Sequence, residues 1–158
     1  MGTSAEISFT VEYLKKEFEK RDFGKTKFCL GLQIEHLNNV ILVHQETYTE
    51  NVLKRFYMDG AHPLSSPMVV RSLDVDKDPF RPRESNEEVL SPEVPYLSAI
   101  GALMYLASHT RPDISFAVNL LARFSSCPTR RHWNGIKHIL RYLQGTKDMG
   151  LYFPNKSK

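Results

Sequence analysis

The strongest constraint on how this 158-residue chain folds lies between Tyr96 and Thr146, where apolar residues recur at helical spacing in three successive stretches. Residues three and four positions apart share one face of a helix, so each stretch predicts an amphipathic helix that buries one side. Thr110-Arg111-Pro112 separates the first two stretches, and Pro128-Thr129 separates the last two. Three helices with such short connections predict a helical bundle over residues 93–145.

Two details refine this bundle. Thr110 and Asp113 have the spacing of a capping box, which predicts that the second helix begins at Thr110. The third helix is expected to end at Gly145, because glycine commonly follows the last helical turn. Its apolar face is expected to be buried and consists of Trp133, Ile136, Leu140 and Leu143.

The N-terminal part, residues 1–68, mixes helical and strand patterns. Apolar residues at steps of four, three and four predict a helix over residues 5–20, with Ser4 as its N-cap. Alternation from Phe28 to Glu35 predicts one strand, and Asn38-Asn39 predicts a tight turn into a second strand. Helical spacing returns from Glu46 to Tyr57.

Residues 69–92 are rich in proline and charge, which predicts a flexible linker. The expected fold class is therefore α+β: a helix and a β-hairpin, then a linker, then a helical bundle.

Positive charge is concentrated in the second half of the chain. Residues 93–158 contain nine Lys or Arg and three Asp or Glu, whereas residues 1–92 contain twelve and fifteen. A basic helical surface favours a polyanionic partner. On the third predicted helix, Arg130, Asn134, Lys137 and Arg141 form a stripe opposite the Trp133 face. This stripe predicts phosphate contacts, although an ordinary solvated face is the alternative.

Ordered matches along nearly the whole chain, except residues 69–92, resemble the copia-type retrotransposon reverse transcriptases. In the N-terminal part the matches are Phe18 to Gly24, Phe28-Cys29-Leu30-Gly31-Leu32-Gln33-Ile34, Gln45, Tyr48, Leu53, Phe56 and Ser66-Pro67-Met68. In the C-terminal part they are Tyr96, Ile100-Gly101-Ala102-Leu103-Met104-Tyr105-Leu106, Thr110-Arg111-Pro112-Asp113-Ile114, the Phe124–Pro128 turn, His132-Trp133 and Leu140-Arg141-Tyr142-Leu143-Gln144-Gly145-Thr146.

The resemblance implies that residues 1–68 are the end of a palm and residues 93–145 a helical thumb. Residues 146–158 would begin the connection towards an absent ribonuclease H domain. The family's polymerases hold two magnesium ions with a Tyr-x-Asp-Asp hairpin and one earlier Asp, but this sequence has no Asp-Asp pair. The expected chain is a fragment that is not itself an enzyme and holds no cofactor.

The resemblance also implies nucleic-acid contacts. The hairpin from Phe28 to His44 resembles the primer grip, which suggests Phe28, Gly31 and Gln33 as contact residues. Glycine weakens a strand unless something approaches closely. At Gly31 that could be a nucleic-acid backbone or, equally, a neighbouring helix.

The helix from Tyr96 to Ser108 resembles the thumb helix that lies along the minor groove of the template–primer. Gly101 and Tyr105, four residues apart, would permit close approach and stacking on sugars. A helix–helix contact at Gly101 is the alternative. At the start of the third helix, Arg130 and Arg131 could hold a phosphate together with the backbone amides.

The expected partners are an RNA/DNA hybrid or DNA duplex, bound weakly and salt-dependently, and the rest of the polymerase polyprotein. The alternatives are a protein-interaction module, self-associating through exposed palm surface and the unpaired edges of the hairpin, or a decayed element without a selected function.

Several other classes are not supported by the sequence. No apolar run approaches the length of a membrane span, and the N-terminus lacks a signal-peptide pattern, so we expect an intracellular protein, cytoplasmic or nuclear. The histidines have no ligand cluster at zinc spacing, and Pro79 stands where a calcium loop needs glycine.

Overall fold

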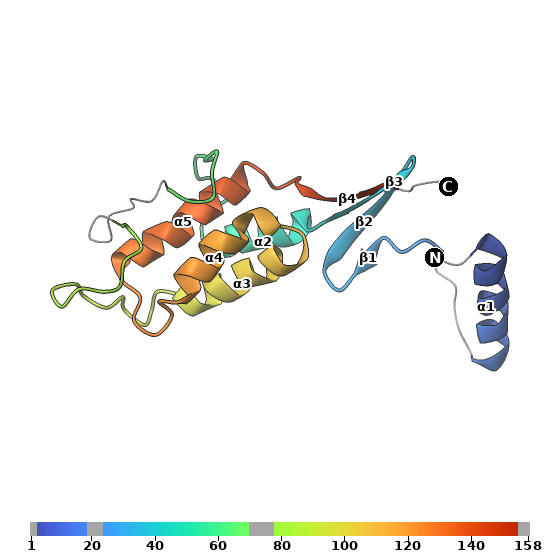
Figure 1. Ribbon diagram of the computed structural model, residues 1–158, viewed down its shortest axis with the longest axis horizontal. Helices are drawn as coiled ribbons and strands as arrows, with labels where there is room; N and C mark the ends of the chain where they lie inside the picture. Colours follow the sequence, from blue (N-terminus) through green and yellow to red (C-terminus); the bar gives the residue numbers. More distant parts are fainter. Residues whose placement is uncertain (1–2, 19–23, 70–77, 155–158) are drawn as a thin grey trace.

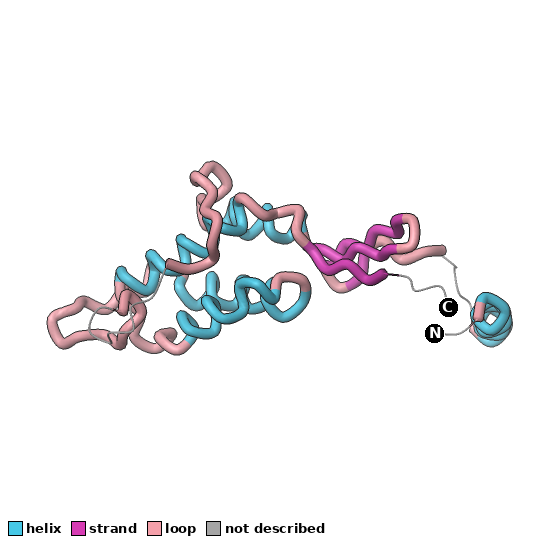
Figure 2. Tube along the Cα trace, turned by 45° about the horizontal axis from the view of Figure 1, so that its top comes forward, coloured by secondary structure: helices cyan, strands magenta, loops and turns pink. Residues whose placement is uncertain are grey.

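The computed structural model describes residues 3–18, 24–69 and 78–154, and it confirms the α+β class. Figure 1 shows the helical bundle at one end of the molecule, an antiparallel sheet beside it, and the first helix beyond the sheet. The tube view in Figure 2 gives the same order of parts.

The first helix, α1, spans Ser4–Glu17. Its N-cap is Thr3 and not the expected Ser4, because the Thr3 hydroxyl accepts from the Glu6 amide while the Glu6 carboxylate accepts from the Thr3 amide. The predicted apolar face is not buried: Ile7 and the C-cap residue Phe18 are each 57% exposed, and Val11 and Leu14 are half-buried.

Four strands form the sheet in the order β1-β2-β3-β4, with every pair antiparallel. Their bounds are β1 Phe28–Cys29, β2 Leu32–Leu37, β3 Val40–His44 and β4 Gly150–Pro154. The expected turn at Asn38-Asn39 joins β2 to β3, and Asn39 has a φ of 61°. Asparagine tolerates this left-handed conformation better than most residues.

The prediction of a single strand from Phe28 to Glu35 is wrong, because the chain reverses its direction within this segment. Cys29 pairs with Leu32, and the two residues between them, Leu30 and Gly31, form the turn. Their φ angles are 49° and 78°. The apolar alternation runs on unbroken through a two-residue turn, so it could not reveal the reversal.

Strand β4 was not expected from the sequence, and it changes the edges of the sheet. Val43 pairs with Leu151 and Ile41 with Phe153, so β4 covers the outer side of β3. The outer side of β2 is paired with the short strand β1. The prediction that the hairpin has unpaired edges is therefore wrong for β3, whereas β2 pairs with β1 only at Leu32 and Gln33.

The remaining helices follow the apolar stripes. Their bounds are α2 Glu46–Arg55, α3 Tyr96–His109, the 3₁₀ turn η2 Pro112–Ile114, α4 Ser115–Ala122 and α5 Arg130–Gln144. Helix α5 begins after the N-cap Thr129 and ends at Gly145, as expected.

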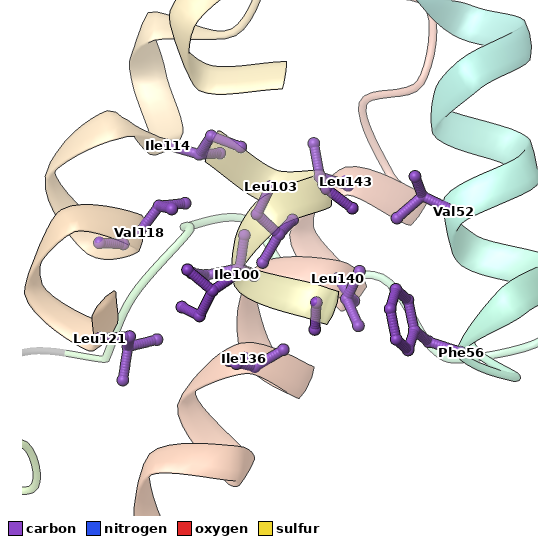
Figure 3. Packing of buried hydrophobic residues seen from close by; sticks show 14 of the residues in the cluster. Val52, Phe56, Ile100, Leu103, Ile114, Val118, Leu121, Ile136, Leu140 and Leu143 are labelled. Atoms are coloured by element: carbon purple, nitrogen blue, oxygen red, sulfur yellow. The ribbon is translucent and has the colours of Figure 1, made fainter. Parts of the chain in front are cut away.

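One hydrophobic core joins all of these helices except α1 (Figure 3). Val52 and Phe56 reach it from α2, although α2 precedes the expected linker. Trp133 is buried, as predicted, and its ring centroid lies 6.5 Å from those of Phe56 and Tyr96.

The capping box expected at the second helix is wrong. The Thr110 hydroxyl donates to the side-chain oxygen of Gln45 at 2.8 Å, and Asp113 accepts from Arg111 instead. The chain therefore enters α4 through η2, whose N-cap makes no side-chain hydrogen bond.

Arg111 is only 1% exposed and sits at the centre of a polar network. Its guanidinium donates twice to the Asp113 carboxylate, and also to the backbone oxygen and hydroxyl of Thr146. The Tyr142 hydroxyl donates to the same carboxylate. Burial raises the pKa of Asp113, but the hydrogen bonds from Arg111 and Tyr142 outweigh it and bring this pKa below its ordinary value. The network fixes the end of α5 against the corner between α3 and α4.

Part of the expected linker is packed. Phe80 is 5% exposed, and its ring lies above Gly135, where a Cβ would come within 2.6 Å of it. The Arg131 guanidinium donates to both carboxylate oxygens of Glu87 and to the backbone oxygens of Pro79 and Arg81. The segment is thus packed at Asp78, Phe80 and Glu87, whereas residues 82–86 and 88–89 are exposed. Residues 70–77 lie outside the described residues, and the linker over residues 69–92 stays a prediction.

Replacing Trp133 by Ala should lower the free energy of unfolding by roughly 3–5 kcal/mol, because it leaves a cavity between Phe56 and Tyr96. Urea denaturation followed by circular dichroism measures this, and Leu97→Ala, at an exposed position of α3, is the control. Equal stability of the Trp133 variant and the wild type would contradict the packing of the core.

The Glu87–Arg131 pair should make stability sensitive to acid. The hydrogen bonds from Arg131 lower the pKa of Glu87 from 4.5 to about 2. A lowered pKa stabilises the fold above the unfolded value of 4.5, and this contribution disappears as the pH falls from about 4.5 to about 2. Glu87→Gln should therefore cost about 1 kcal/mol or less at neutral pH and almost nothing near pH 2.

Urea denaturation at several pH values compares Glu87→Gln with Glu88→Gln, which removes the same charge from an exposed neighbour. If the difference in free energy of unfolding between the two variants stays the same in acid, the ion pair does not contribute to stability.

Candidate nucleic-acid interface

Helix α3 buries one face and exposes another. Tyr96, Leu103 and Leu106 lie in the core, whereas Leu97 is 66% exposed and Met104 43% exposed. Gly101 lies between these two, and a Cβ built there would meet nothing within 4 Å. The alternative of a helix–helix contact at Gly101 is therefore not supported. We call the exposed row of Leu97, Gly101, Met104 and Ser108 the α3 stripe.

The structure brings two of the predicted contact residues together, Gly31 and Tyr105. The Tyr105 hydroxyl donates to the backbone oxygen of Leu30, and a Cβ on Gly31 would lie 2.9 Å from that hydroxyl. What approaches Gly31 closely is thus a side chain of α3. This is the packing alternative considered for Gly31.

Tyr105 is also enclosed by other aromatic rings. The Tyr48 ring of α2 meets it edge-on with centroids 4.9 Å apart, and the centroid of the His109 ring lies 4.4 Å from that of Tyr105. Burial raises the pKa of Tyr48, with a smaller contribution from Tyr105. Tyr105 therefore joins α3, α2 and the turn between β1 and β2.

Gln33 has a structural partner, whereas Phe28 remains in solvent. The Gln33 side-chain oxygen accepts from the Thr47 amide at 2.8 Å, in the first turn of α2. It satisfies a helix-terminal amide that the N-cap residue, Gln45, leaves without a side-chain bond. Phe28 is 71% exposed and lies in β1, close to the turn between β1 and β2.

The basic residues of α5 fall into two groups. Arg130 and Lys137 are exposed, and the Lys137 ammonium lies 6.0 Å from the centroid of the Trp133 ring. Arg141 donates to the backbone oxygen of His62 at 2.8 Å and so holds the loop after α2. Arg131 is bound by Glu87, so a carboxylate occupies the place where the sequence predicted a phosphate.

The two sets of predicted residues do not form one surface. Figures 1 and 2 place α3 and α5 on opposite sides of the bundle. Both helices bury their inner faces in the same core, so the α3 stripe and the basic residues of α5 point away from each other.

Sequence reasoning missed three exposed residues in and before the turn that Tyr105 contacts. Leu30 is 85% exposed, and Lys25 and Lys27 lead into β1 with exposed side chains. The lysines could have been found as cations next to the primer-grip-like segment. The exposure of Leu30 could not be predicted, because the turn in which it lies cannot be recognised from the apolar alternation of the sequence.

Within residues 3–18, 24–69 and 78–154, the structure contains no group of three His, Cys, Asp or Glu side chains that could hold a metal ion. The same residues include no helix that is long and apolar enough to cross a membrane.

Comparison with known proteins identifies relatives of this chain, although no protein-family model and no solved structure matches it. It is 41% identical over 135 residues to the retrovirus-related Pol polyprotein from transposon TNT 1-94 of Nicotiana tabacum. The aligned region covers 84% of this chain and 10% of the relative. It is 32% identical over 146 residues to the corresponding polyprotein from transposon RE2 of Arabidopsis thaliana, covering 92% and 9%.

A shorter match, 55% identical over 60 residues, is to the secreted RxLR effector protein 161 of Plasmopara viticola and covers 38% of this chain and 42% of that protein. The chain thus spans about a tenth of the transposon polyproteins that it matches. Those matches extend over most of its length at 32–41% identity. The chain therefore belongs to the copia-type retrotransposon Pol polyproteins, of which it matches one segment.

Proposed function

We propose that this chain is the palm-end, thumb and connection segment of a copia-type reverse transcriptase, and that it binds template–primer duplex weakly through the α3 stripe. The observation that carries the proposal is the exposure of Leu97 and Met104 on either side of a glycine with open space above it. A flat apolar row of this kind suits the shallow minor groove of a hybrid duplex, where sugars are contacted by shape.

Neighbouring features support the α3 stripe as the contact surface. The turn between β1 and β2 is attached to α3 through the Tyr105 hydroxyl, and Phe28 lies in β1 just before this turn. Lys25 and Lys27 precede this turn and add the positive charge that α3 itself lacks. Phosphates of a duplex lying along α3 would be in reach of these lysines, which accounts for a salt-dependent affinity.

The chain has no catalytic role in this proposal. Nucleotidyl transfer needs carboxylates that hold two metal ions, and the sequence has no Asp-Asp pair to supply them. We expect no magnesium-dependent primer extension by the purified chain, and extension that survives repurification would contradict the proposal.

Gly101→Leu should weaken duplex binding by about tenfold or more, because the added side chain holds the duplex away from α3. Gly101→Ala should keep the fold and stabilise α3 by about 1 kcal/mol, since its Cβ meets no neighbour. Fluorescence anisotropy with a labelled RNA/DNA hybrid measures affinity, and Asn51→Leu, at an exposed site of α2, is the control.

Unchanged affinity of Gly101→Leu would rule out the α3 stripe. A parallel double variant, Arg130→Gln with Lys137→Gln, tests the opposite surface. If that surface binds phosphates instead, the plot of log affinity against log salt concentration will become less steep in this variant, by about one unit of slope for each lost contact.

A second candidate function, protein interaction, is favoured by the outer face of the sheet. Ile34, Val43 and Leu151 are paired across three strands and remain only half-buried, and Phe153 beside them is 53% exposed. Apolar surface of this kind can be covered by another protein. Self-association that resists salt, measured by sedimentation, would favour this function over duplex binding.

A further inference from the structure

We propose that this chain pairs with a second copy of itself by exchanging α1, so that α1 of each copy covers the outer face of the other copy's sheet. The inference deepens the protein-interaction candidate described above and rests on it. It joins two apolar surfaces that the structure leaves uncovered, one on a helix and one on a sheet.

Helix α1 leaves its apolar stripe uncovered. Ile7, Val11 and Leu14 lie at steps of four and three on one side of the helix, and none of them is buried. The hydrophobic core contains no residue of α1. A helix of 14 residues is only marginally stable in water by itself, so α1 depends on burying this stripe against another surface.

The outer face of the sheet is apolar across three strands. The pairing of β2, β3 and β4 gathers five side chains on it: Ile34, Ile41, Val43, Leu151 and Phe153. Four of them are half-buried, and Phe153 is 53% exposed. The face of an antiparallel sheet that meets water is normally polar. An apolar outer face therefore indicates a covering layer, and a helix with an apolar stripe is a common cover.

The two surfaces also match in size. Helix α1 has 14 residues and is about 20 Å long. Strand β2 has six residues and likewise spans about 20 Å. Three neighbouring strands make a face about 10 Å wide, which is roughly the diameter of one helix.

Charges at the borders of the two surfaces are complementary. Glu6 and Glu17 are 11 positions apart, so they lie on the same side of the apolar stripe, and both are exposed. Lys27 lies opposite Ile34 at the β1 edge of the outer face, because the Ile34 amide donates to its backbone oxygen. If α1 lies with its acidic border towards β1, these charges meet. They select this orientation, whereas the apolar contacts supply the affinity.

A second copy, and not the chain's own α1, is the occupant that the structure favours. Figure 1 shows α1 beyond the sheet and separate from it, so the stripe and the outer face of one copy remain apart. A two-fold exchange forms the same contact twice in one dimer. Both contacts then count towards the roughly 1,200–2,000 Å² that stable interfaces bury.

Sedimentation velocity of the full chain over a series of concentrations tests the exchange, and it should show a monomer–dimer equilibrium. Ile7→Glu should raise the dissociation constant of the dimer by about tenfold or more, because the lost apolar contact occurs twice. Phe153→Glu should do the same from the side of the sheet. Glutamate at position 7 does not weaken α1 itself, since the helix dipole favours acidic residues near the N-terminus.

Phe9→Glu and Tyr152→Glu are the matched controls. Phe9 is 73% exposed and lies on the opposite side of α1 from Ile7. Tyr152 is 64% exposed and lies on the opposite face of β4 from Phe153. Both controls should leave the dissociation constant unchanged. If Ile7→Glu and Phe153→Glu dimerise as tightly as their controls, the exchange is overturned.

Cross-linking identifies which surfaces meet. Cys29→Ser and Cys127→Ser first remove the two native thiols, which are exposed. One chain then carries Val11→Cys, and a second chain, lengthened by a tag, carries Ile41→Cys. A bis-maleimide should join the two different chains in their mixture. If it instead joins Val11→Cys chains to one another, the helices pair among themselves and the exchange is overturned.

Duplex affinity is measured on the same variants, so that this inference and the proposed duplex binding can fail separately. Ile7→Glu and Phe153→Glu should bind the labelled RNA/DNA hybrid like the wild type, because neither residue belongs to the α3 stripe. If the wild type binds the hybrid but stays monomeric at every concentration, the exchange is overturned and duplex binding stands. If it dimerises through these two surfaces without binding the hybrid, the exchange stands and duplex binding is overturned.

Discussion

The buried guanidinium of Arg111 is the interaction on which the arrangement of the other parts depends. A charge that is 1% exposed is tolerated only when it is paired and its hydrogen-bond donors are used, and Arg111 meets both conditions through Asp113 and Thr146. Thr146 follows the end of α5 and precedes β4. The direction in which the chain leaves the bundle, and hence its return to the sheet, is therefore set by the corner between α3 and α4.

Much of the fold could be predicted because it depends on local periodicity. The helical stripes that predicted α3 and α5 include Leu103 and Trp133, which are buried as expected. Features that depend on distant partners could not be predicted. Thr110 bonds Gln45, which is 65 positions away, and not Asp113. Strand β4 is a short apolar segment whose identity as a strand comes from pairing with β3.

The contacts of the candidate site residues could be predicted even less well than the fold. Glycine, glutamine, aromatic and basic residues suit nucleic acid by their type, but residue type does not indicate which of them bond to other parts of the protein. Gln33 binds Thr47, Arg131 binds Glu87, and Arg141 binds His62. Phe28 and Gly101 are left facing solvent, and the structure adds Leu30 to them. A left-handed leucine cannot be recognised until the turn around it is known.

The pairing of β4 with β3 has a consequence for how the molecule holds together. The sheet takes three strands from before residue 45 and one from after residue 149, and the core likewise combines α2 with α3, α4 and α5. A chain interrupted between residues 69 and 78 would therefore not come apart into a palm piece and a thumb piece. Its two halves would remain joined as a non-covalent complex, and separately made halves should reassemble by complementation.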